Sequence, residues 1–151
     1  TQESVLAVFD YLTEKLGLEA FRALFPVILT DNGVEFKDPD QLEHAPNNCP
    51  RTKIFYCDPQ ASWQKPHVEK NHVLLRRILP KGTSFKDLTK AQVALATSHI
   101  NSVARELFDN QTPFDLFVGE NEKKLLELLD LSPIAPDEVY LKPALLKTKP
   151  N

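Results

Sequence analysis

The chain has 151 residues, which is the size of one compact domain. Its composition, 42% hydrophobic and 26% charged, is that of an ordinary soluble globular protein and argues against a disordered chain, and no apolar run is long enough to span a membrane. The net charge of -3 argues against a uniformly basic nucleic-acid-binding protein.

The charge is distributed unevenly along the chain. Residues 1–50 carry three bases and nine acids, residues 51–90 carry nine bases and three acids, and residues 91–151 carry six bases and nine acids. A basic middle between acidic ends is expected if one segment binds a polyanion. A solvated charged face would give the same pattern, so the charge alone leaves both interpretations open.

Two cysteines, Cys49 and Cys57, are too few for a disulfide framework and indicate reduced thiols in a cytosolic protein. Structural zinc ligands usually have about two to four residues between paired cysteines, and the longer spacing here disfavours a zinc site shared with His67 and His72. No secretory signal is visible. The sequence begins at Thr1 and contains no Met, so we expect a piece of a longer cytoplasmic protein.

The first part of the chain predicts two helices followed by two short strands. Apolar residues recur at helical spacing up to Gly17, and a second helical turn ends at Pro26. A short apolar run then enters the turn Asp31-Asn32-Gly33, and a second apolar run ends before Asp58-Pro59. The predicted ranges are 2–16, 18–25, 27–30 and 53–57.

The rest of the chain predicts helices. One covers about 66–79 and stops at Pro80, and the next begins with a capping box of Thr89 and Gln92. Pro113 opens another helix and residues 120–129 form a last one, before a proline-rich tail that is extended and either packed or frayed. The predicted buried stripe of the second of these helices is Val93, Ala96, Ile100, Val103 and Leu107.

Two acids stand where functional side chains are expected. Asp31 follows a buried strand, a position from which α/β proteins present site residues, although Asp-Asn-Gly is also a common turn. Glu69 opens a helix, where the macrodipole alone favours an acid. Thirty-seven residues lie between the two acids. Together the two acids favour a metal site with oxygen ligands.

The helix that contains Glu69 has two different faces. At 100° per residue, one arc carries apolar residues that should anchor it: Val68, Leu74, Leu75, Ile78 and Leu79. The other arc carries Glu69 with the bases Lys70, Arg76 and Arg77. We expect an acid that binds metal while its basic neighbours hold phosphates, unless this face is only solvated.

These segments resemble the retroviral-integrase-like catalytic core of bacterial insertion-sequence DDE transposases. The resemblance rests on Thr30-Asp31-Asn32-Gly33-x-Glu35-Phe36 and on the run from Tyr56-x-Asp58-Pro59 through Trp63-Gln64-Lys65 to Val68-Glu69-x-Asn71, and it extends over about residues 1–148. It implies a ribonuclease H-like fold in which three acids hold two Mg²⁺ or Mn²⁺ ions for DNA cleavage and strand transfer. Asp31 matches the second acid and Glu69 the third. The spacing is slightly longer than is usual in integrases, which implies a small loop insertion.

The first acid of that set has no counterpart in this chain. In the family it lies on a strand that precedes the helix at residues 2–16, and the acids upstream of Asp31 all fall in helical pattern. We therefore expect a partial α/β ribonuclease H-like fold whose N-terminal strands are missing, since two strands are too few for an independent sheet. The chain alone should be inactive, and the sequence leaves open whether it binds metal.

The resemblance also implies the remaining assignments. Residues 1–82 should be the downstream part of the catalytic core and residues 83–151 a helical C-terminal extension. DNA is the expected partner of a homo-oligomer in the bacterial cytoplasm, with no membrane. The expected DNA-binding residues are Trp63, Lys65, Lys70, Arg76 and Arg77. Two alternatives stay open: a non-catalytic DNA-binding or interaction module derived from such a core, and a metal-dependent nuclease.

Overall fold

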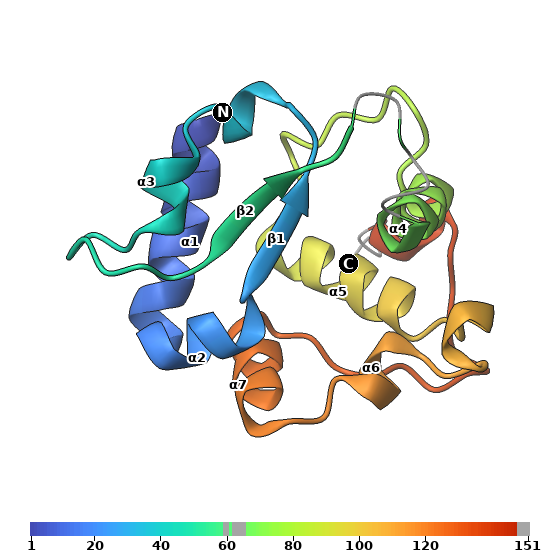
Figure 1. Cartoon of the computed structure of the whole chain (residues 1–151). Helices are drawn as coiled ribbons and strands as arrows, with labels where there is room; N and C mark the ends of the chain where they lie inside the picture. The colour runs from blue at the N-terminus through green and yellow to red at the C-terminus, as the bar shows by residue number, and fades with distance from the viewer. Residues whose placement is uncertain (59–60, 62–65, 148–151) are drawn as a thin grey trace. The chain divides into compact units, whose positions relative to one another are not determined.

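The computed structural model describes residues 1–58, 61 and 66–147. The chain folds as two compact units, residues 1–65 and residues 66–151 (Figure 1). The boundary expected from the sequence, at residue 82, lies inside the second unit; it concerns the extent of a catalytic core and stays a prediction. No helix among the described residues is long and apolar enough to cross a membrane.

The first unit contains a parallel pair of strands beside three helices. Its elements are α1 (Gln2–Leu16), α2 (Leu18–Leu24), β1 (Val27–Thr30), the 3₁₀ turn η1 (Val34–Phe36), α3 (Pro39–Glu43) and β2 (Lys53–Tyr56). β1 and β2 pair in parallel, with Val27 opposite Lys53 and Thr30 opposite Tyr56. The two predicted helices and two predicted strands are confirmed, with their ends shifted by at most one residue.

The second unit is helical. Its elements are α4 (Pro66–Ile78), α5 (Lys90–Asn101), η3 (Glu106–Phe108), α6 (Pro113–Leu116), α7 (Glu120–Leu128) and η4 (Pro143–Leu146). The predicted α/β class is confirmed, since the described residues form mostly helices and one two-stranded parallel sheet. The completion of that sheet into a ribonuclease H-like fold stays a prediction.

The core of the first unit is built around a buried arginine. Arg51 donates to the carbonyl oxygens of Leu42 (2.8 Å) and Gln41 (3.3 Å), to the hydroxyl of Thr13 (3.3 Å) and to the carboxylate of Asp10 (2.6 Å). Its guanidinium also lies over the rings of two aromatic residues, Phe9 and Phe21. Arg51 therefore joins α1, α2 and α3 at a point two residues before β2, although the sequence predicted it to be one of the bases of the charged middle segment.

The core of the second unit joins α4 to α5. The buried cluster consists of Leu74, Ile78, Leu79, Ala96 and Ile100. This confirms most of the predicted anchoring face of α4, but Val68 is 42% exposed. Val68 lies in the first turn of the helix, more than a turn before Leu74, and so lies outside the cluster.

The predicted buried stripe of α5 is wrong at both ends. The capping box of Thr89 and Gln92 is confirmed, but Val93 beside it is half exposed. The helix ends at Asn101, and the chain turns before it reaches Leu107, which is 69% exposed. Leu107 therefore no longer follows the helical period on which its burial was predicted.

The tail after α7 is packed along α5. Two side chains of α5 and its C-cap residue accept hydrogen bonds from tail backbone N–H groups: Ser98 from Ser132, His99 from Tyr140, and Ser102 from Ile134. Gln92 donates to the carbonyl oxygen of Leu146. The tail is therefore fixed along α5 as far as η4, which agrees with the packed form of the prediction.

We expect Arg51→Met to lower the free energy of unfolding by about 3–5 kcal/mol, because it removes one partner of a buried ion pair and leaves main-chain acceptors without a donor. Arg22→Met is the control, since Arg22 pairs with Glu19 and donates to the Pro50 carbonyl oxygen at the surface. An exposed pair contributes about 0.2–1 kcal/mol and a hydrogen bond about 0.5–1.5 kcal/mol. Urea denaturation of both variants measures the difference. Equal losses in the two variants would contradict the role given to Arg51.

A second prediction concerns His99, whose pKa is lowered by burial. The ring must be neutral for its Nδ1 to accept from Tyr140 N–H over 3.0 Å. Below the ordinary histidine pKa of about 6.5, the unfolded chain takes up a proton that the folded chain resists, so stability should fall as the pH falls below that value. Urea denaturation across the range from about pH 7.5 to pH 5 tests this, again because an ordinary histidine titrates within it.

His99→Asn provides the control for this measurement, because it offers an amide oxygen near the position of Nδ1 but does not titrate. The variant should lose the part of the pH dependence that lies in this range. If the pH dependence of stability were unchanged in the variant, it would arise from groups other than His99.

Candidate functional site

Asp31 lies directly after β1, at the carboxyl end of the parallel pair. Main-chain pairing continues to this point, since the Cys57 N–H donates to the Thr30 carbonyl oxygen over 2.7 Å. Thr30 is buried and Asp31 is exposed. The predicted position of Asp31, an exposed carboxylate at a strand end, is therefore confirmed. The predicted burial of the strand is wrong, because side chains alternate along β1 and those of Val27 and Leu29 are exposed.

The turn after Asp31 is held by contacts of its own. The Phe36 N–H donates to the Gly33 carbonyl oxygen over 3.0 Å, and the Tyr56 hydroxyl donates to the Phe36 carbonyl oxygen. Beside this turn lies a cavity of about 370 Å³, lined by Asn32, Gly33, Phe36, Lys37, Pro39 and Tyr56.

Glu35, the second acid of this turn, points elsewhere. It lines a different cavity together with residues of α1, and its carboxylate lies over Gly33, where an added Cβ would be 2.9 Å from it. The structure therefore distinguishes the two acids of the turn. Asp31 terminates the strand, whereas Glu35 packs toward α1.

Glu69 lies in the first turn of α4 and lines a cavity of about 460 Å³. The α4 side of this cavity has four residues, and the opposite side is formed by the segment after α5. The lining residues are His67, Glu69, Lys70, Val73, Ala104, Arg105, Glu106 and Leu107. The His67 ring is stacked on Phe108, with 4.9 Å between ring centroids. Acidic and basic side chains therefore line one cavity at the start of α4.

Arg105 joins the two sides of this cavity. Its side chain is buried, and its guanidinium donates to the carbonyl oxygens of Val103 (3.1 Å) and Ile100 (3.0 Å) and to Oδ1 of Asn71 (3.0 Å). Burial lowers the pKa of the Arg105 guanidinium. The ordinary pKa of arginine is so high that the group still remains charged. Because Asn71 is two residues from Glu69, Arg105 fixes the part of α4 that presents the acid.

The exposed bases of α4 lie where the helical period predicts them. Arg76 and Arg77 are both exposed, and the Arg76 guanidinium lies over the ring of Phe85 at 5.9 Å. Lys70 lies with Glu69 at the cavity. The other predicted DNA-binding residues, Trp63 and Lys65, lie outside the described residues.

The predicted site residues are thus divided between the units. The second unit brings Glu69 and Lys70 together and carries Arg76 and Arg77, and Asp31 is in the first unit. Within the described part of the chain, no three His, Cys, Asp or Glu side chains form a group that would hold a metal ion. Carboxylates at Asp31 and Glu69 are ligands of the kind that Mg²⁺ and Mn²⁺ prefer.

Three residues that lie beside the candidate acids were not among the predicted site residues. Asp58 follows β2 at the edge where Asp31 follows β1, because the carboxyl ends of parallel strands coincide. Arg105 and Glu106 reach the Glu69 cavity from the segment after α5. The parallel pairing was the available signal for Asp58. No local pattern distinguishes Arg105 from a surface arginine, because its burial depends on the packing of α4 against α5.

The chain is similar to transposases over part of its length. It is 27% identical over 101 residues to the transposase of insertion sequence element IS4351 of Bacteroides fragilis, a match that covers 67% of this chain and 30% of that protein. It is 30% identical over 64 residues to transposase InsI of insertion sequence element IS30A of Escherichia coli, which covers 42% of this chain and 17% of that protein.

A similar match, 27% identity over 64 residues, is found with the transposase of insertion sequence element IS1086 of Cupriavidus metallidurans and covers 42% of this chain and 19% of that protein. The chain thus spans less than a third of the length of the curated relatives it matches. No protein-family model matches the chain, and no solved structure matches it. The similarity to insertion-sequence transposases that the acidic motifs indicated is confirmed over part of the chain.

Proposed function

We propose that this chain is part of the catalytic core of an insertion-sequence transposase, in which Asp31 and Glu69 are two of three acids that hold divalent cations. The position of Asp31 carries the proposal. An exposed carboxylate directly follows a strand of a parallel pair, in a chain related to transposases. The carboxyl ends of parallel strands are where α/β proteins place their functional residues.

The two acids would act as oxygen ligands for Mg²⁺ or Mn²⁺. Divalent cations held in this way make water or a DNA 3′-hydroxyl a better nucleophile and stabilise the leaving oxygen. Asp31 is held by the strand pairing of β1. Glu69 is held by the first turn of α4, which Arg105 fixes through Asn71. Both carboxylates thus lie on segments that are held in place by neighbouring contacts.

The first acid of the set is still needed, and the described acids upstream of Asp31 do not suit the role. Glu3, Asp10 and Glu14 lie on α1 and Glu19 lies on α2, and Asp10 pairs with the buried Arg51 over 2.6 Å. We therefore place this first acid elsewhere in a longer transposase, of which this chain would be one part.

The edges of the sheet support a larger fold. On β2, the Ile54 N–H donates to the Glu43 carboxylate over 2.9 Å, so α3 occupies that strand's outer edge. Within the described residues, no strand pairs with the other edge of β1. Parallel strands are usually central in larger sheets, and open edges are usually covered. A ribonuclease H-like sheet that continues beyond β1 would satisfy both rules.

DNA is the proposed substrate, and the exposed bases of α4 are its proposed phosphate contacts. Lys70 lies beside Glu69, and Arg76 and Arg77 follow on the same helix, away from the buried Leu74 and Ile78. Contacts of this kind position a duplex without reading its sequence. The homo-oligomeric state expected for such an enzyme is part of the same proposal.

The acids can be tested in a transposition assay with the gene that encodes this chain. Asp31→Asn and Glu69→Gln should each abolish transposition, because each removes a charged ligand oxygen while keeping the volume of the side chain. Folding, followed by circular dichroism, should change little, since both side chains are exposed. Glu35→Gln is the control in the same turn as Asp31 and should retain most activity. Activity in either of the first two variants close to that of the parent would refute the proposal.

The bases can be tested by measuring DNA affinity against salt concentration. Arg76→Ala with Arg77→Ala should weaken binding equally for unrelated sequences, and each lost phosphate contact should reduce the salt slope by about 0.9. Lys123→Ala with Lys124→Ala is the matched control, because it removes two adjacent exposed bases from α7 in the same unit. If both pairs reduced the slope equally, the effect would be one of net charge and not of contact.

A further inference from the structure

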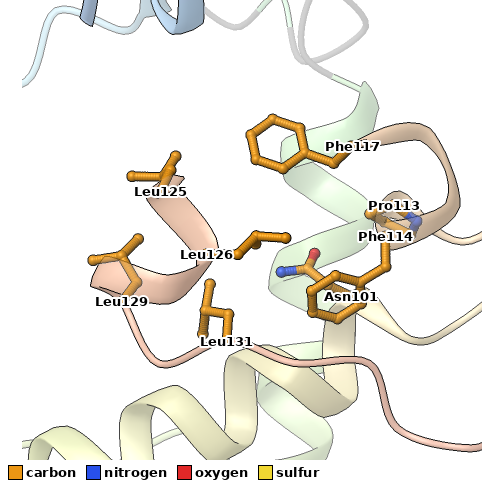
Figure 2. Close-up of a pocket in the computed structure, with 8 residues that line it drawn as sticks. All are labelled: Asn101, Pro113, Phe114, Phe117, Leu125, Leu126, Leu129 and Leu131. Carbon is orange, nitrogen blue, oxygen red and sulfur yellow. The ribbon is translucent and has the colours of Figure 1, made fainter. Parts of the chain in front are cut away.

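The second unit contains an apolar cavity that the proposed catalytic role does not use. It lies between the end of α5, α6 and α7 and has a volume of about 220 Å³. The residues that line it are Asn101, Pro113, Phe114, Phe117, Leu125, Leu126, Leu129 and Leu131. Figure 2 shows the leucines of α7 and Leu131 on one side and Phe114 and Phe117 on the other, with the amide of Asn101 between them.

The walls of this cavity are fixed by helix caps. α6 starts with a capping box in which Thr112 and Asp115 exchange hydrogen bonds, with Pro113 at its first position. α7 ends where the Leu131 N–H donates to the Leu126 carbonyl oxygen over 2.9 Å, and Asp130 between them has φ 54°. This is a Schellman ending, which brings Leu131 against Leu126. The walls of the cavity are therefore held in place by contacts within the chain.

The size of the cavity limits what it can hold. Sites for small molecules and cofactors usually have volumes of about 300–1,000 Å³. This cavity is smaller. Its floor, at Phe114 and Leu125, is buried, whereas Leu129 at its rim is 40% exposed. The space suits one or two apolar side chains that enter from outside. Asn101 provides the single polar side chain among those that line it, a group that can orient a peptide.

The charge around the cavity selects the type of partner. Residues 106–130 carry seven acids and only two bases. Some of these acids adjoin the lining residues directly: Asp115 follows Phe114, Asp130 follows Leu129, and Glu122 lies one turn before Leu126 on the same face of α7. Such a border repels DNA phosphates and attracts Lys and Arg side chains.

We propose that this cavity binds a basic amphipathic helix of a partner protein. One or two apolar side chains of this helix, at positions i and i+3 or i+4, enter between α6 and α7, and Lys or Arg side chains beside them contact the acidic border. An apolar face laid into a hydrophobic groove is a recurring mode of peptide recognition. The surface is separate from the bases of α4, so it gives the second unit a protein-binding role in addition to the proposed DNA contacts.

The probe for this proposal is a fluorescein-labelled helical peptide with leucines at i, i+3, i+4 and i+7 and lysines at the remaining positions. Fluorescence anisotropy should detect its binding to the chain, with an affinity that decreases as salt increases. A peptide in which every lysine is replaced by glutamate should not bind. Equal binding of the two peptides would overturn the proposal.

The cavity itself is tested with two variants of equal charge. Leu129→Lys, at the rim, should weaken binding of the lysine peptide by about tenfold or more, equivalent to about 1.4 kcal/mol. Leu116→Lys is the control, because Leu116 is 49% exposed on α6 and does not line the cavity; it should leave the affinity within about twofold, less than 0.5 kcal/mol. Equal effects of the two variants would overturn the proposal.

A second measurement does not depend on the folding of a variant. Peptide-induced shifts of leucine methyl resonances in the parent chain should occur at Leu125, Leu126 and Leu129, and not at Leu74. Shifts that map to α4 would overturn the proposal. So would self-association of the chain that Leu129→Lys abolishes and Leu116→Lys does not, since the occupant would then be a second copy.

Discussion

The first unit depends on the burial of one guanidinium. A charge removed from water costs several kcal/mol unless its hydrogen bonds and its charge are matched. Arg51 meets both conditions, because it donates to two carbonyl oxygens, a hydroxyl and the Asp10 carboxylate and lies over two aromatic rings. Because Arg forms planar, directional hydrogen bonds with a fixed set of donors, it holds all these groups in one arrangement.

That arrangement determines where the candidate acid lies. Arg51 precedes β2 by two residues, and its own N–H donates to the Glu43 carbonyl oxygen over 2.7 Å. The start of β2 is thereby fixed against α3, and the parallel pairing transfers this position to β1 and so to Asp31. The same arginine engages Asp10, which makes Asp10 a structural acid. The contacts of Arg51 thus fix the strand end that carries Asp31, and they occupy the carboxylate of Asp10.

The sequence was sufficient for features that short segments encode. Helix starts at Thr89 and Thr112 follow from capping chemistry, and strand ends follow from the turn at Asp31. Features that depend on tertiary contacts were not predictable in this way. Arg51 and Arg105 have the sequence context of surface bases and are buried, whereas Val68, Val93 and Leu107 fit an apolar period and are exposed. Periodicity gives the face of a helix, but only the neighbouring element decides how far along that face burial extends.

The total charge of the chain conceals the distribution that matters for binding. In water at physiological salt, exposed charges interact over about 8–10 Å, so a ligand responds to the residues near it and not to a net charge of -3. In the second unit, α4 carries Lys70, Arg76 and Arg77, whereas the region around α6 and α7 has a strong excess of acids. Electrostatics favours the proposed DNA contacts at the first region and opposes them at the second, and the preference is reversed for the proposed basic helix. Local charge of opposite sign would therefore direct the two proposed ligands to different parts of one small unit.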